Sequence, residues 1–216
     1  HNSRQLDISN KRQLQSNLSD VLNKVYTKAP RIFNELLNRD RPSAQANSAR
    51  NKLLAAMLAE PSHKDLAIDK FPAEKSIYRA LLLSSGIHCI DGDKWTFKAP
   101  TDMGSQNAAN MQHVWQRIDE FLDSTEREAK SFADLNSELL APPFGVKAGV
   151  LPVIYVAVYL VYQHELAIYE SRRYSPYFTQ EMLEQFVKRP DEFTFQRFRI
   201  SGMRASIFKQ YSQVIH

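Results

Sequence analysis

Cysteine is almost absent from this sequence, and its scarcity excludes several kinds of structure. Cys89 is the only cysteine among 216 residues. No disulfide can therefore form within the chain, and no cysteine-based zinc site can be assembled. A single cysteine is typical of a reducing compartment, so we expect a cytoplasmic protein. Glycine (6) and proline (10) are also scarce, which favours long regular elements over a loop-rich fold.

Motifs that bind nucleotides or metals, or supply a nucleophile, are lacking as well. The chain contains no GxxxxGK[ST], no GxGxxG, no GxSxG and no HExxH or HxH. His88 precedes Cys89, but neighbours along a strand point to opposite faces, so this histidine cannot readily activate the thiol. Adjacent acids such as Asp119 and Glu120 are typical of a solvated helix face. We therefore expect no catalytic residue, no cofactor and no metal, and hence no enzymatic activity of this chain.

No apolar run is long enough to cross a membrane. The longest, 148–162, is interrupted by Pro152, whereas a membrane span needs about 20 apolar residues. Tyr155, Tyr159 and Tyr162 recur in it at helical spacing, as expected for a buried helix whose tyrosine hydroxyls reach a polar edge. We expect a core helix and no membrane partner.

The rest of the chain is rich in apolar residues at helical spacing. Ser43 and Thr179 are suitable N-caps, and Gly86 and Pro190 are suitable stops. The helices predicted from this spacing cover 11–28, 32–37, 43–60, 72–85, 111–130, 131–139, 150–163, 179–189 and 203–215.

Two segments predict β-hairpins. Residues 87–97 carry the turn Asp91-Gly92-Asp93 between short strand-like runs, and 166–178 have a polar turn near 170–173. Residues 193–200 alternate as a further strand would. The predicted fold class is mainly α with short β-hairpins.

A weak internal similarity suggests two tandem units. Residues 72–97 and 152–178 both run from a proline through a helix to a hairpin, and a helix followed by a hairpin is how a winged-helix unit ends. We predict two tandem winged-helix-like helical units. The alternative is two helical subdomains with incidental hairpins. The predicted boundaries are a disordered tag scar or linker at 1–10, a first unit at 11–100, a linker at 101–110 and a second unit at 111–216.

Charge gives a second line of argument. The net charge is +4, and the first hundred residues hold sixteen Lys and Arg against ten Asp and Glu. A basic bias permits contact with nucleic acid, and the tip of a winged-helix wing can neutralise phosphates. The alternative is that these are ordinary surface cations. The candidate nucleic-acid-binding residues are Arg39, Arg41, Arg50, Lys52, Arg172 and Arg173.

Three segments carry a resemblance to a known family. They read VYTKAPRIFNELLNRDRPSAQANSAR (25–50), APPFGVKAGVLPVIYVAVYL (141–160) and YSPYFTQEMLEQFVKRPDEFTFQRFRISG (174–202). Together they resemble a non-catalytic region of large bacterial P-loop ATPases of the restriction and phage-defence type. The resemblance implies that the chain is part of a longer ATPase whose P-loop lies elsewhere. It carries over no catalytic residue.

The leading functional hypothesis is a non-catalytic accessory module of a larger bacterial ATPase that contacts nucleic acid or a partner protein. DNA and the neighbouring ATPase domains are the partners it implies. A second hypothesis is a pure protein-interaction or scaffold domain, with an open apolar patch around 193–198. A third is an enzyme whose site is assembled from scattered polar residues.

Overall fold

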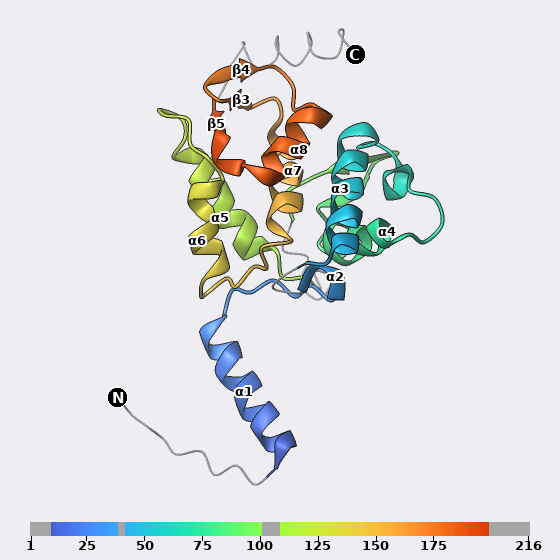
Figure 1. Cartoon of the computed structure of the whole chain (residues 1–216), viewed down its shortest axis with the longest axis vertical. Helices are drawn as coiled ribbons and strands as arrows, with labels where there is room; N and C mark the ends of the chain where they lie inside the picture. The colour runs from blue at the N-terminus through green and yellow to red at the C-terminus, as the bar shows by residue number, and fades with distance from the viewer. Residues whose placement is uncertain (1–9, 39–41, 101–108, 199–216) are drawn as a thin grey trace.

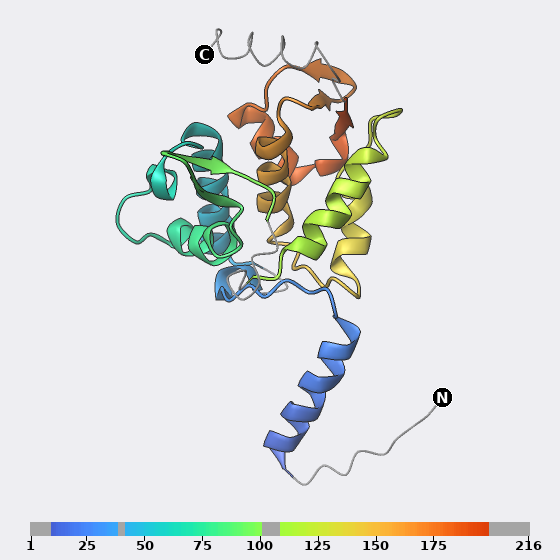
Figure 2. The ribbon, with the colours of Figure 1, turned by 180° about the vertical axis from the view of Figure 1, so that it is seen from behind.

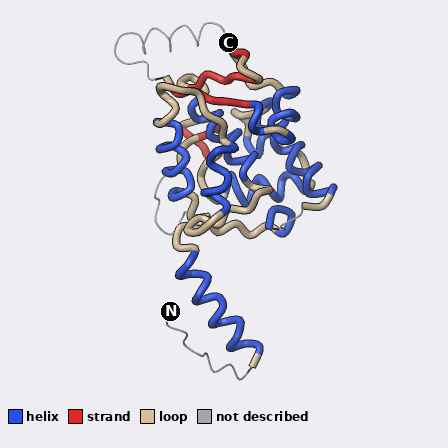
Figure 3. The backbone as a smooth tube through the Cα atoms, turned by 60° about the vertical axis from the view of Figure 1, so that its left-hand side comes forward, coloured by secondary structure: helices blue, strands red, loops and turns tan. Residues whose placement is uncertain are grey.

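The computed structural model describes residues 10–38, 42–100 and 109–198. Helices dominate this part of the chain, and short strands gather at two places (Figures 1 and 3). The helix predicted for 203–215 lies outside the described residues. The α-helices are α1 (Lys11–Val25), α2 (Glu35–Asn38), α3 (Ala44–Ala59), α4 (Ala73–Tyr78), α5 (Gln112–Asp123), α6 (Ala133–Leu140), α7 (Leu151–Tyr162) and α8 (Gln180–Lys188).

Shorter helical turns complete the connections. The 3₁₀ turns η1 (Lys64–Ala67) and η4 (Pro190–Glu192) lie in loops, and the π-helical turn η2 (Arg79–Leu83) continues α4 directly. Residues 62–72, predicted as a connector, thus contain η1.

Both predicted hairpins are confirmed. Antiparallel β1 (His88–Asp91) and β2 (Lys94–Phe97) form a two-stranded sheet. In the second sheet, β3 (Leu166–Glu170) lies between β4 (Arg173–Ser175) and β5 (Phe193–Arg197), and both pairings are antiparallel. The strand predicted at 193–200 therefore joins the second hairpin after α8, so that hairpin is part of a small sheet and not an isolated flap.

Local sequence signals account for several helix ends. Ser43 Oγ accepts a hydrogen bond from Ala46 N at 3.2 Å, and Thr179 Oγ1 accepts one from Met182 N at 3.3 Å. Both side chains satisfy a backbone donor that the first helical turn leaves free. Gly86 follows η2 in the left-handed region, with φ 71°.

The helix predicted over 32–37 is wrong in its start. Asn34 Oδ1 accepts a hydrogen bond from Leu36 N at 3.0 Å, and α2 begins only at Glu35. Side chains of this type compete with the backbone and delay a helix. Phe33 precedes the helix and is 85% exposed, although the spacing placed it inward.

One hydrophobic core runs through the described residues and is centred on α7. Helix α3 packs against both α7 and α8, and β2 also contacts α7. Buried residues from both predicted units therefore share a single core. Of the predicted linker, 101–108 lie outside the described residues, and Ala109 is fully buried. The division of the chain at 101–110 stays a prediction, as does the winged-helix-like character of the two parts.

Arg197 joins the second sheet to the helices. Its Nη1 donates to Asp119 Oδ1 at 2.7 Å and to Asp123 Oδ1 at 2.8 Å, and its Nη2 donates to Glu165 Oε2 at 3.0 Å. The guanidinium lies 4.6 Å from the centre of the Tyr162 ring. Burial acts to lower the pKa of Arg197, but the hydrogen bonds to these carboxylates outweigh it and the pKa is raised. Asp119, which was expected on a solvated helix face, forms an ion pair with Arg197.

A second buried polar contact lies behind the first hairpin. His88 Nε2 lies 3.0 Å from the carbonyl oxygen of Pro61, and its Nδ1 lies 2.8 Å from the hydroxyl oxygen of Tyr78. Because a carbonyl only accepts, Nε2 carries the proton and Nδ1 accepts from Tyr78. His88 is fully buried, and burial lowers its pKa. The folded state therefore holds a neutral histidine.

We expect Arg197→Met to lower the free energy of unfolding by about 2–3 kcal/mol. This loss lies between those known for exposed and for buried ion pairs, because the carboxylate partners of Arg197 are partly exposed. Urea denaturation measures this loss. Arg189→Met is the matched control, since its ion pair with Glu192 lies at the surface and contributes little to stability. Equal losses in the two variants would contradict the assigned role of Arg197.

We expect the stability of the chain to fall as the pH drops below about 6.5, the ordinary pKa of histidine. Below that pH His88 becomes protonated in the unfolded chain but stays neutral in the folded chain. This difference persists until the pH reaches the lowered pKa of His88 in the folded state. The unfolding free energy measured in urea at several pH values should fall less steeply in His88→Gln than in the native chain. An unchanged slope in His88→Gln would refute the effect.

Candidate interaction surfaces

Helix α1 exposes an apolar face that nothing in the described part of the chain covers. Figure 1 shows α1 extending away from the helical body, and none of its residues is buried. Five apolar side chains on it are between 43% and 54% exposed. We call these residues the α1 face: Leu14, Leu18, Val21, Leu22 and Val25.

The α1 face has the spacing of a helix–helix seam. Leu14, Leu18, Val21 and Val25 alternate steps of four and three residues, which aligns them along one line of the helix. The sequence correctly predicted the helix. Periodicity does not reveal whether the apolar stripe is covered, because a core helix and an interface helix share the same pattern.

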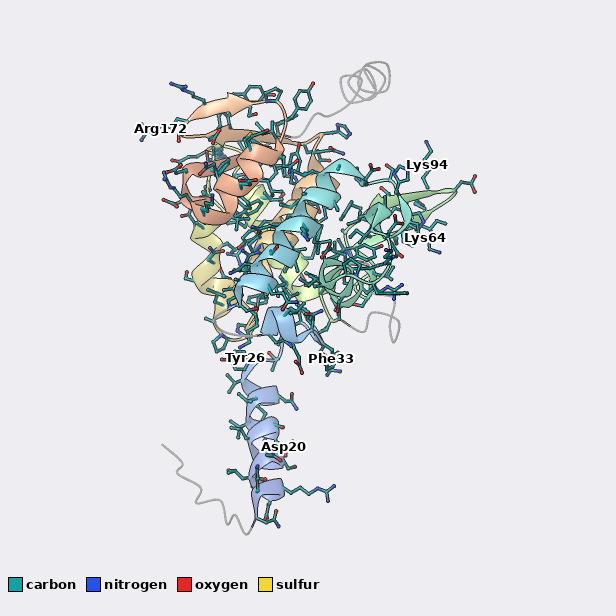
Figure 4. The ribbon with its side chains drawn as sticks, turned by 45° about the vertical axis from the view of Figure 1, so that its right-hand side comes forward. Asp20, Tyr26, Phe33, Lys64, Lys94 and Arg172 are labelled. Carbon is teal, nitrogen blue, oxygen red and sulfur yellow. The ribbon has the colours of Figure 1, made fainter. Side chains whose placement is uncertain are left out.

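A tight backbone contact fixes the place where α1 leaves the body. The ring of Tyr26 packs on Gly145 so closely that a Cβ there would lie 2.5 Å from Cδ1 of Tyr26. Lys28 N also donates to the carbonyl oxygen of Pro143 at 3.0 Å. Figure 4 shows Tyr26 at this junction, with Asp20 farther along the projecting helix. Gly145 is needed here both for its φ of 60° and for the space it leaves.

The patch expected around 193–198 is not open. Phe193 is 0% exposed and Phe195 is 1% exposed, because alternate residues of β5 point into the core, and Phe198 is 36% exposed. The apolar surface that a scaffold domain needs lies on α1 instead.

The predicted nucleic-acid-binding residues are not one patch. Arg39 and Arg41 lie outside the described residues. Lys52 is exposed on α3, and Arg172 and Arg173 are exposed beside each other at the β3–β4 turn. The remaining member, Arg50, is half-buried and lines a cavity between helices. Geometry therefore offers Arg172 and Arg173 to a ligand as a pair.

The β3–β4 turn aims this pair outward. Ser171 has φ 47° and Arg172 has φ 67°, as in the tight turns that match the twist of a hairpin. Ser171 N donates to the carbonyl oxygen of Glu192 at 2.9 Å, which ties the turn to the loop before β5. Figure 4 shows Arg172 projecting from this end of the molecule, far from Lys94 on the first hairpin.

The first hairpin is less suited to an anion. Its turn contains Asp91 and Asp93, and Asp91 Oδ2 lies 2.6 Å from Lys98 Nζ. This ion pair offsets part of the positive charge near the tip.

A basic and aromatic cluster beside α4 went unnoticed in the sequence. Phe71 is 82% exposed, and the charged groups of Lys75 and Arg79 lie 5.8 Å and 5.3 Å from its ring centre. Lys75 Nζ also pairs with Asp65 Oδ2 at 2.9 Å and donates to the carbonyl oxygen of Ile68. The i, i+4 spacing of the two cations was the only available signal. Asp65 already offsets the Lys75 charge, so we interpret this cluster as structural.

Metal-binding groups are not found in the part of the chain that the structure describes. No three His, Cys, Asp or Glu side chains there are arranged to hold a metal ion. Cys89 is half-buried while His88 points into the core, on the opposite face of β1. None of the described helices combines the length and apolar content needed to cross a bilayer.

Comparison with known proteins adds no family to this picture. No protein-family model, no curated protein and no solved structure matches the chain. The functional argument therefore rests on the surfaces described above, of which the α1 face carries five exposed apolar side chains.

Proposed function

We propose that this chain is a non-catalytic interaction module that binds a helix of a partner protein on the α1 face. The observation that carries the proposal is the exposure of five apolar side chains along one side of a projecting helix. Contiguous apolar surface of this kind marks protein-binding sites, because its burial removes apolar area from water. An amphipathic partner helix would complete the seam.

The charge of α1 indicates what flanks the apolar face of the partner. Lys11, Arg12 and Lys24 lie on this helix with Asp20 as its single acid. Opposite charges across an interface guide encounter and suppress wrong partners. We therefore infer a partner helix whose apolar residues are bordered by Asp and Glu.

A second copy of α1 is the less suitable partner. Two such helices would bring their basic residues together, and like charges across an interface are unfavourable. The helix has 15 residues, about two heptads, which is too short for a stable two-helix coiled coil on its own. A partner already held nearby in a larger assembly overcomes this limit through its high effective concentration.

The resemblance to a non-catalytic region of large bacterial P-loop ATPases supplies a context for this partner. In that context the acidic helix belongs to a neighbouring ATPase domain or to a protein recruited by it. The ATP-hydrolysing chemistry would then lie outside this chain.

Contact with nucleic acid through the β3–β4 turn is the second candidate function. Arg172 and Arg173 are adjacent, exposed and held on a tight turn. In a winged-helix-like arrangement a turn of this kind reaches the phosphate backbone. Such contact would be independent of sequence and sensitive to salt.

For the α1 face we predict that the chain binds a designed amphipathic helix with leucines along its seam and glutamates beside them. Fluorescence anisotropy with the labelled peptide measures the dissociation constant. A peptide with lysines in place of the glutamates should bind about tenfold or more weakly. Leu18→Asp should abolish binding, because it places a charge in the buried seam.

Ser19→Asp is the matched control, because it adds the same charge to the same helix outside the seam. This variant should still bind the glutamate peptide. Light scattering after size exclusion provides a second readout. If the native chain forms a dimer and Leu18→Asp is monomeric, the α1 face binds a second copy of this chain and not a partner helix. Equal binding of both peptides, or none, would refute the proposal.

For the β3–β4 turn we predict that the double variant Arg172→Ala/Arg173→Ala binds duplex DNA more weakly than the native chain in gel-shift titrations. The slope of log K against log salt should decrease by about 0.9 for each phosphate contact that is lost. Lys11→Ala/Arg12→Ala removes the same charge from α1 and should leave the slope unchanged. Unchanged binding by the hairpin variant would eliminate this function.

A further inference from the structure

A cavity of about 190 Å³ lies where α3, α6, α7 and α8 approach one another. Its wall is mostly apolar and includes Leu151, Phe186 and Val187. Two polar side chains, Arg50 and Asn136, complete the lining. Figure 2 shows these helices from behind, grouped around α7. An apolar pocket with a few polar groups is the usual form of a small-molecule site.

Arg50 is half-buried in the wall of this cavity. Its Nε is buried, and it is the one buried side-chain nitrogen or oxygen of the described residues that has no hydrogen-bond partner. Burial lowers the pKa of Arg50, and no neighbouring carboxylate opposes that effect. Arg197 is the internal comparison, since three carboxylates surround it. Buried charges in proteins are normally paired, because an unpaired one is costly.

The neighbours of Arg50 also favour an anion. Asn136 Oδ1 accepts a hydrogen bond from the Tyr155 hydroxyl at 2.7 Å, which leaves the amide Nδ2 as the group able to donate. Helix α7 begins at the cavity, where Leu151 is its first residue, and no side chain caps its start. The amino end of a helix carries a partial positive charge. Three independent groups therefore present positive charge or a donor to one space.

We propose that this cavity binds a small monocarboxylate with an apolar body, whose carboxylate pairs with Arg50 and accepts from Asn136. The guanidinium offers a planar pair of donors that matches a carboxylate. The apolar body lies against Tyr155 and Phe186 from α7 and α8. This binding is separate from the α1 face and needs no partner helix.

The size and lining of the cavity limit the class of ligand. Its volume corresponds to about six waters at roughly 30 Å³ each, enough for a short branched acid and not for a polymer. Inorganic phosphate carries more charge than one guanidinium can offset, and the apolar wall would leave its remaining oxygens without donors.

Thermal unfolding of the native chain, Arg50→Met and Lys52→Met tests the proposal, with 4-methylvalerate, its neutral amide or inorganic phosphate as the probe. Without a probe, Arg50→Met should raise the unfolding midpoint, because it removes a half-buried charge that no carboxylate pairs. The carboxylate should raise the midpoint of the native chain and of Lys52→Met, whose exposed residue lies on the same helix, but not that of Arg50→Met.

Calorimetric titration of the native chain gives a readout that needs no variant. The carboxylate should bind about tenfold or more tightly than the amide. A lower midpoint for Arg50→Met without a probe would overturn the proposal, because it would show that Arg50 is satisfied within the fold. Equal shifts with the carboxylate and either other probe, an equal shift in Arg50→Met, or no shift at all would also overturn it.

Discussion

The burial of α7 on every side is the constraint on which the rest of this fold depends. From Leu151 to Leu160 all but one of its side chains are buried, so no face of the helix can be left to water. The helices α3, α6 and α8 and strand β2 contact it, and each tyrosine hydroxyl on α7 needs a polar partner. Tyr155 donates to Asn136, and Tyr159 and Tyr162 accept from Phe178 N and from Trp115. The need to bury α7 thus determines where its neighbouring elements lie.

Two arginine side chains of this fold lie in different electrostatic environments. Arg197 is held by three carboxylates and a tyrosine ring, so its charge contributes to the fold. Arg50 contributes a charge that no carboxylate near it offsets. Arg50 is half-buried, so a hydrophobic side chain of similar size could occupy the position without losing an ion pair. The contrast between the two arginines is therefore an argument about function.

How much could be predicted depends on the separation of the interacting residues. The caps at Ser43 and Thr179 act within three residues, and the tight hairpin turns are equally local, so the sequence predicted them. Arg197 and Asp119 lie 78 residues apart, and no spacing rule joins them. Arg50 was expected at the surface because arginine is rarely buried. The exposure of the α1 face could not be predicted, because its pattern also suits a core helix. Pattern therefore predicts elements, while chain packing decides which faces remain free.

The anchoring of α1 by Tyr26 on Gly145 has a geometric consequence. Helix α1 extends from one end of the body, and the β3–β4 turn lies at the opposite end (Figure 1). A helix of 15 residues is about 22 Å long, so anything held along it stands clear of the core. Two ligands, one at each end, would occupy the molecule together without steric competition. The chain has the proportions of a spacer that keeps two larger bodies apart while linking them.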